Sequence, residues 1–466
     1  MAAVAEDPNA LFWKAYAAAI MERAGKINIG DTNAFYLATS AQRGPPGGDG
    51  ISQKYTNEGI FQLGDNLLPA DQLFYSPSSE NSYIQSLQDY LRWVDIGGDP
   101  TPENVARVNA ASEDLDAAHK KFKTELTKAL SDFKDEQAAG MTSKLTFAQW
   151  AISNAGAYEA AKTAYDTATA AYTEAYSRAY GPLGQQKLQD QNKLNQAEVT
   201  DSASALPGFT MECAIGTPPS PREIQDHQGD DSISNPASVP RPAYEALNYV
   251  SVIQQALMRR EDDPPRANLE FTFRNGQDVR VEEFNHSFIS GGVTVDYEPW
   301  ISFGVSASQD NVWHGISTNV DFEQITFKLT FDDMAFVGIN PSASWDLGDV
   351  RARYKGLLPG APKSVHTLVK PSQLLLATHL GYTIKLGAAM ANEFDSHYQQ
   401  VTQAQGSIRI LGILAGPTAN FSQKNYQNTH MLDWNASSQE ITVKPTTNTG
   451  FATIVGIVGE KLNVSA

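Results

Sequence analysis

The chain has 466 residues, 41% of them hydrophobic and 19% charged, with a formal net charge of −18 at pH 7. This length suffices for two or three domains and a large core. An acidic surface repels nucleic-acid phosphates, and no Lys/Arg cluster reverses this locally, so we expect no nucleic-acid partner. Cys213 is the single cysteine, which excludes an intrachain disulfide.

The first residues do not resemble a secretory signal, because Ala2 to Asp7 holds two acids and no basic region. No apolar run approaches the ~18 residues that a membrane-spanning helix needs. The sequence therefore predicts a protein that is cytoplasmic as synthesised, with release, where it occurs, by a non-classical route.

Residues 1–200 are predicted to form a helical domain. Apolar residues at helical spacing predict helices over 11–23 and 79–94, while 29–77 is expected to be mostly irregular. Thr101, Pro102 and Glu103 combine a cap, a first-turn proline and a first-turn acid, which predicts the start of a long helix over about 102–139.

A second long helix is predicted over about 146–180, after a break at Gly140, with a polar helix over 183–196 behind it. Two neighbouring helices of similar length predict an antiparallel hairpin. Alanines let the helix axes approach closely, and tyrosine rings fill the remaining gaps. The expected seam repeats every seven residues and consists of Tyr158, Ala161, Tyr165, Ala168, Tyr172 and Ala175.

The segment just past the predicted hairpin tip, Leu145 to Tyr158, contains no charged residue. Trp150 and Ile152 lie within it and are our candidates for contact with a membrane or a partner. The segment is not apolar enough to enter a membrane alone.

Residues 201–265 are rich in proline, serine and aspartate, which predicts a linker with one strand over 208–215 and one helix over 244–259. After 266 the hydrophobic period changes from 3.6 to 2, so 266–466 is predicted to be β-rich, with a hairpin at Asn275-Gly276. Strands are expected over 269–273, 279–281, 293–297, 301–305, 325–331, 350–354, 408–414, 441–443 and 451–458, and a short helix over 372–380.

The predicted fold class is therefore α+β. It combines an N-terminal helical domain, carrying the long antiparallel α-helical hairpin, with a C-terminal antiparallel β-sandwich-like domain.

No catalytic or metal-binding motif stands out. The eight histidines are scattered, and no HExxH, CxxC, EF-hand, GxGxxG or GxSxG pattern is present. Asp332 and Asp333 are adjacent on a predicted strand end and point to opposite faces, so they do not form a glycosidase pair. We expect no cofactor and no metal, and the sequence gives an enzyme no positive support.

Tryptophans of the β-rich part are candidates for ligand-binding loops: Trp300, Trp313 with its neighbour His314, and Trp434. Tryptophan at a loop tip stacks on sugars or enters a membrane interface. Trp345 belongs to the same group of four tryptophans, and core filling is the alternative expected for at least two of them.

The layout resembles, in architecture alone, soluble proteins that convert to membrane-bound pore formers, and no motif or residue carries over. The leading hypothesis is a non-enzymatic toxin-like or defence protein that binds a membrane lipid or glycan surface through its β-rich half. It acts through a rearranging hairpin, because an alanine-rich seam buries little area and separates more easily than a leucine seam. A self-assembling structural or storage protein and a carbohydrate-binding protein are the alternatives, with self-association expected.

Overall fold

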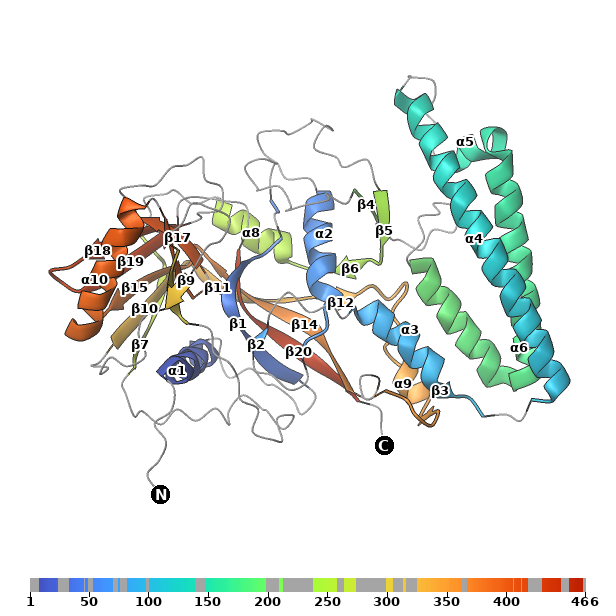
Figure 1. Ribbon diagram of the computed structural model, residues 1–466, viewed down its shortest axis with the longest axis horizontal. Coiled ribbons are helices and arrows are strands. Elements are labelled where there is room, and N and C mark those ends of the chain that lie inside the picture. The colour runs from blue at the N-terminus through green and yellow to red at the C-terminus, as the bar shows by residue number, and fades with distance from the viewer. Residues whose placement is uncertain are drawn as a thin grey trace.

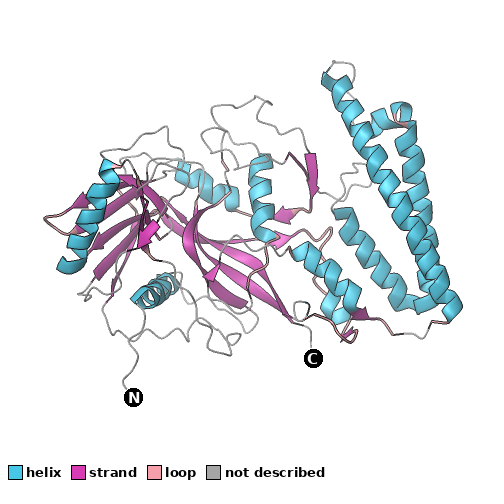
Figure 2. Ribbon diagram, viewed as in Figure 1, coloured by secondary structure: helices cyan, strands magenta, loops and turns pink. Residues whose placement is uncertain are grey.

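The computed structural model of the chain is α+β, as the sequence predicted, with antiparallel sheets at one end and long helices at the other (Figures 1 and 2). The structure describes residues 8–23, 33–45, 47–48, 53–69, 74–75, 82–97, 100–138, 147–197, 209–212, 238–257, 264–273, 299–304, 313–315, 325–362, 365, 367–404, 406–411, 413–417, 430–445 and 452–463.

The larger sheet has nine strands, and all its neighbours are antiparallel except β17 and β18. In sheet order the strands are β7 (Ala267–Phe273), β10 (Ile325–Phe331), β15 (Gly381–Lys385), β19 (Glu440–Pro445), β18 (His430–Asn435), β17 (Ile413–Pro417), β16 (Ser407–Ile410), β8 (Ile301–Gly304) and β9 (Trp313–Gly315). Buried residues alternate along β10, because one of its faces packs on the core.

The smaller sheet has five strands and joins distant parts of the chain. In sheet order they are β11 (Asp333–Gly338), β14 (Thr367–Thr378), β20 (Thr453–Asn463), β1 (Asn33–Arg43) and β2 (Phe74–Tyr75). β1 pairs antiparallel with β20, so strands from both ends of the chain meet in this sheet. Residues before position 100 therefore contribute directly to the β-rich half.

At two places the chain passes from one sheet directly into the other, and these two places lie at the same corner. β10 continues into β11 through Asp332, and β14 continues into β15 through His379 and Leu380. The Asp332 amide donates to the Thr378 carbonyl at 3.0 Å, and His379 has a left-handed φ of 49°. The His379 Nδ1 atom lies 2.8 Å from a carboxylate oxygen of Asp332. These contacts hold the two sheets at a fixed bend.

The smaller sheet separates two hydrophobic cores. Phe35 and Leu375 on one face join the core that includes the larger sheet, α1 (Pro8–Arg23) and α10 (Ala388–Gln403). Tyr36 and Leu374 on the other face join a second core with α2 (Gln53–Gly64), α3 (Tyr83–Trp93) and α8 (Tyr249–Leu257). Side chains on successive strand positions point to opposite faces, so one sheet serves both cores.

Short elements connect these layers. β3 (Val94–Asp95) pairs with β13 (Gly356–Leu357), β6 (Tyr244–Glu245) with β12 (Asn340–Pro341), and β4 (Phe209–Glu212) with β5 (Ser238–Arg241). A single turn of helix, α9 (Val350–Arg353), is linked to α3 although the two are far apart in sequence. The Tyr90 hydroxyl of α3 donates to the carbonyl of Tyr354, the residue after α9, at 2.6 Å.

The long helices are α4 (Pro102–Ala138), α5 (Phe147–Asn154) and α6 (Gly156–Ala197). Thr101 caps α4, since its Oγ1 accepts a hydrogen bond from the Asn104 amide at 3.3 Å. Gly181 has φ 69° and ψ −157°, which interrupts α6. We call α4, α5 and residues 156–180 the arm, and residues 182–197 the return helix. Figure 1 shows the arm beside the sheets and the return helix doubling back along it.

The long helices and their antiparallel pairing confirm the predicted hairpin, and the helices at 11–23 and 79–94 are confirmed with shifted ends. Four secondary-structure predictions were wrong, and one of them is the single strand over 408–414, which is two antiparallel strands, β16 and β17. Residues 29–77 contain β1, α2 and β2, residues 350–354 are mostly helical, and residues 372–380 extend a strand. The run Leu374 to Ala377 is buried on both sheet faces, so it lacks the alternation that marks a half-exposed strand.

Other predictions differ in detail or fall elsewhere. The helix at 244–259 covers Tyr249–Leu257, and the helix predicted over 146–180 begins as two helices that meet at Ala155. The hairpin at Asn275-Gly276, the strands over 279–281 and 293–297, Gly140 and Cys213 lie outside the described residues. The domain limits at 200 and 266 stay a prediction.

We expect Phe12→Ala to destabilise the fold strongly. The Phe12 ring is fully buried and stacks on Trp300 with centroids 4.4 Å apart, so its loss leaves a cavity between α1 and the larger sheet. The free energy of unfolding should fall by about 3–5 kcal/mol in urea titrations. Leu247→Ala, at a side chain that is 75% exposed, is the control and should change it by about 0.5 kcal/mol or less. Equal effects of the two variants would contradict the assigned packing.

Candidate functional site: the helical arm and its anchor

The outer half of the arm is held by stacked aromatic rings. Tyr165 lies between Phe122 and His119, with ring centroids 5.4 and 5.2 Å away, and its plane is 12° from that of Phe122. Tyr158 is 3% exposed and also contacts Phe122, at 5.9 Å. Ala161 is 1% exposed, so this small side chain is covered as well. The first three predicted seam residues therefore face α4.

The helix α5 closes the end of the arm. Trp150 is 2% exposed, packs on the Phe133 ring at 5.4 Å and donates its indole N–H to Glu136 Oε2 at 2.8 Å. Ile152, two residues on, is 74% exposed. In this conformation Trp150 belongs to the arm's interior, and Ile152 is the one of the two candidates that faces solvent.

The inner half of the arm is a ladder of tyrosines. Tyr176 lies between Tyr172 and Tyr180, with ring centroids 5.6 and 4.5 Å away. It is 9% exposed and shares a core with Val108 and with Leu188 of the return helix. The remaining seam residues, Ala168, Tyr172 and Ala175, are half-buried.

Burial raises the pKa of Tyr165, Tyr172 and Tyr176, because it disfavours the charged phenolate. At Tyr176 the neighbouring rings of Tyr172 and Tyr180 add to the increase. The packing of the seam therefore favours the neutral form of these tyrosines.

A sharp reversal follows the ladder. Gly181 adopts a left-handed φ, which glycine accepts without steric cost. Gly184 lies so close to the ladder that a Cβ atom there would be 2.5 Å from the Cβ of Tyr180 and 3.2 Å from the ring of Tyr176. These two glycines allow the return helix to pack tightly against the arm.

The opposite side of the return helix is fixed to the β-rich half by a buried carboxylate. Asp190 is 4% exposed and accepts hydrogen bonds from Arg353 Nη1 at 2.5 Å, Tyr354 Oη at 2.9 Å and Gln186 Nε2 at 3.2 Å. A partly buried ion pair with further hydrogen bonds fixes orientation well, because a lost partner leaves a buried charge. We call this group of contacts, with those of Lys193, the anchor.

Lys193 completes the anchor by donating to two carbonyls, those of Asp346 at 2.9 Å and Ala343 at 3.2 Å. Leu194 is fully buried in the core that α3 and the smaller sheet share. The carboxylate of Asp346 accepts from Tyr83 Oη at 2.9 Å. Burial raises the pKa of Asp346, and Lys370 and the Tyr83 hydrogen bond partly offset that increase.

Beneath the anchor, Asp65 forms a second buried polar group. Its carboxylate accepts from Ser82 Oγ at 2.6 Å, Tyr244 Oη at 2.9 Å and the Ile84 amide at 3.1 Å. Each of its oxygens has a partner, which is typical of a structural carboxylate that positions α3. We assign it a supporting role.

The tryptophans of the β-rich half are dispersed. Trp300 is 3% exposed and stacks on Phe12, so its ring lies in the core. Trp434 is half-buried under α10, where its indole N–H donates to Asp395 Oδ1 at 2.7 Å. Trp345 is 1% exposed and donates to the Ala243 carbonyl at 2.7 Å.

Trp313 and His314 lie in β9, where their backbones pair with Gly304 and Phe303. Their side chains are outside what the structure describes. The described tryptophan rings therefore lie at separate places and form no common site.

The anchor residues were missed by sequence reasoning. Arg353 falls within the predicted strand over 350–354, and Asp190 is one acid within the predicted polar helix over 183–196. One signal was present, since Leu188 and Leu194 are six residues apart and lie on different sides of a helix. Two apolar sides indicate a helix packed between two partners.

Within the described ranges, no three His, Cys, Asp or Glu side chains are arranged to hold a metal ion. None of the helices among these residues is both long enough and apolar enough to cross a membrane. Comparison of the chain with protein-family models, curated proteins and solved structures found no match.

Tyr165→Glu should destabilise the arm by about 1–3 kcal/mol, because a carboxylate cannot replace a ring stacked between Phe122 and His119 without losing hydration. Thermal unfolding followed by circular dichroism checks this. Ala164→Glu adds the same group on the exposed side of the helix and should be nearly neutral. Unchanged stability in Tyr165→Glu would mean that another face of α6 forms the seam.

Alkaline pH should weaken the arm. The seam tyrosines have raised pKa values in the folded protein, so their contribution is complete below the unfolded value of about 10 and is lost as pH rises through the folded values. In denaturant titrations from about pH 8 to 11, Tyr172→Phe/Tyr176→Phe should lose less stability than the parent protein. If the parent protein and the variant lost stability equally as the pH rises, these hydroxyls would not be the cause of the loss of stability.

Proposed function

We propose that this is a non-enzymatic toxin-like or defence protein that binds a membrane or cell surface through its β-rich half and acts by rearranging the arm. The observation that supports it is how the arm is attached. Among the described residues, α4 and residues 156–180 pack chiefly on each other and on α5, and they meet the rest of the protein through the return helix and through Ile96, which follows β3. Such an element can change its packing while the sheets stay intact.

The seam suits this role because its contacts are small or aromatic. Alanines at 161, 168 and 175 bury little area, so opening the helices costs less than it would with leucines. Opening exposes the rings of Tyr158, Tyr165 and Trp150, and aromatic rings are favoured at the membrane–water interface. The closed arm keeps these rings out of water, and the open arm presents them to lipid.

The length of the arm supports action at a distance from the sheets. With 37 residues, α4 extends roughly 55 Å at about 1.5 Å per residue. The helix α5, which contains the exposed Ile152, lies near the end of the arm remote from α9 (Figure 1). We therefore propose that, once the β-rich half has bound, the α5 end is the first part of the arm to enter the bilayer.

A covalent lock across the seam tests this function. His119→Cys/Tyr165→Cys in a Cys213→Ser background places two thiols where stacked rings lie 5.2 Å apart, and a short bifunctional thiol reagent joins them. The unlocked protein should release dye from liposomes, and the locked protein should lose most of this release. Each single-cysteine variant treated with the same reagent is the control and should keep it.

Two results would contradict the proposal. Dye release by the locked protein equal to that of the unlocked protein would show that the arm need not open. Absence of release by the parent protein from neutral, anionic and sterol-containing vesicles alike would remove membrane action itself.

A further inference from the structure

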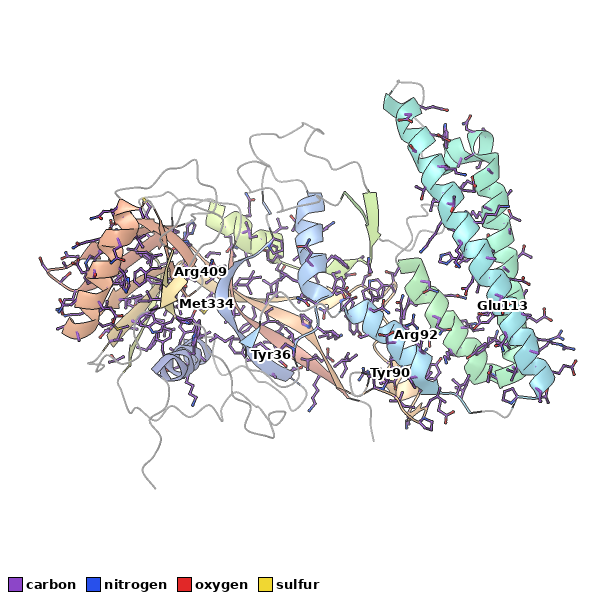
Figure 3. The ribbon with its side chains drawn as sticks, in the orientation of Figure 1. Tyr36, Tyr90, Arg92, Glu113, Met334 and Arg409 are labelled. Atoms are coloured by element: carbon purple, nitrogen blue, oxygen red, sulfur yellow. The ribbon has the colours of Figure 1, made fainter. Side chains whose placement is uncertain are left out.

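One exposed side of α4 carries an ordered charge pattern. Glu113, Asp116, Lys120 and Lys123 are spaced by three, four and three residues, which places all four on one side of the helix. All four are exposed, and Figure 3 labels Glu113 on the arm, away from the sheets. The order along the helix is two acids followed by two bases.

These charges have no ion-pair partner among the described residues, unlike their neighbours. Arg107 pairs with Glu103 at 2.7 Å and Lys128 with Glu125 at 3.0 Å, whereas none of the four contributes to a salt bridge. Each half of the pattern therefore places two like charges three residues apart, and the two halves have opposite sign and meet at Asp116 and Lys120, four residues apart.

The pattern is self-complementary under a two-fold axis. Position 118 is equidistant from Asp116 and Lys120 and from Glu113 and Lys123. When two α4 helices lie antiparallel with their midpoints at position 118, each acid of one copy faces a base of the other, and every contact occurs twice. Such a contact is isologous, and two-fold symmetry is the commonest symmetry of homo-oligomers.

We propose that two copies of this chain associate through this side of α4, the charged side of the arm. The pairs are Glu113 with Lys123 and Asp116 with Lys120, each made in both directions across the two-fold axis. The next residues on this side, Asn109 and Thr127, are also equidistant from position 118 and are uncharged, so no like charges meet beyond the four pairs.

The second copy fits this surface better than a partner of a single charge sign. The chain has a net charge of −18, whereas these four residues sum to zero, so a uniformly charged partner is attracted by one half and repelled by the other. At ~0.15 M salt the Debye length is about 8 Å, which screens the repulsion between the two acidic molecules more than the contacts within the pairs.

Charge reversal tests the pairing in solution, without membranes and independently of the proposed membrane function. Lys120→Glu/Lys123→Glu makes the surface all acidic, and Glu113→Lys/Asp116→Lys makes it all basic. Either variant alone should self-associate roughly tenfold or more weakly than the parent protein in sedimentation experiments at ~0.15 M salt. Mixed together, the two variants should associate, and the fourfold reversal should restore self-association.

Matched control variants change the net charge by the same amount, at positions on another side of α4. Lys121→Glu/Lys128→Glu matches the acidic variant, and Asp114→Lys/Asp132→Lys matches the basic one, at exposed positions that lie off the proposed surface. Both controls should keep the parent's self-association. Failure of the mixture to associate, equal loss in the controls, or a parent protein that stays monomeric at all concentrations would overturn the proposal.

Discussion

The return helix is the element on which the arrangement of the two halves depends. One of its sides receives the tyrosine ladder through Gly184 and Leu188, and the other is fixed through Asp190, Lys193 and Leu194. A helix that packs between two partners must present the right side chains to both of them in a single rotation about its own axis. The left-handed backbone at Gly181 makes this possible, because it turns the chain while keeping the ladder's contacts within reach.

The two halves are stabilised in different ways. In the β-rich half, the smaller sheet separates two cores, and strands that change sheets at Asp332 and His379 make those cores parts of one structure. In the arm, a single seam of small and aromatic residues holds two helices together, with polar and charged residues outside. The opening of the arm that we propose would therefore disturb few contacts of the sheets, since an element with fewer buried contacts opens at lower free energy.

Sequence patterns predicted the elements whose environment is simple. Two neighbouring helices of similar length predicted the hairpin, and the seven-residue spacing of Tyr158, Tyr165 and Tyr172 predicted the buried side of its second helix, because a helix with one partner shows one stripe. β14 was missed, since a strand buried on both faces has no alternating pattern to detect. Trp300 and Trp150 show the same limit in another form, because a tryptophan near a loop in sequence can still fill a core.

The anchor was beyond sequence reasoning for a related reason. Asp190 meets Arg353 and Tyr354 across more than 160 positions of chain, and no local pattern records a pairing of that separation. By contrast, the charge order on α4 is entirely local. Its importance depends on two structural facts: this side of the helix is exposed, and its charges have no ion-pair partner among the described residues.

Native-state hydrogen exchange resolved by peptide tests most directly whether the arm is a separately opening unit. Amides of 102–138 and 156–180 should exchange together with one opening free energy that is lower than that of β10, β14 and β20. The return helix should exchange more slowly than the arm, because the anchor holds it to the sheets. Protection of the arm equal to that of the three strands would contradict a separately opening hairpin and show that the molecule opens as one unit.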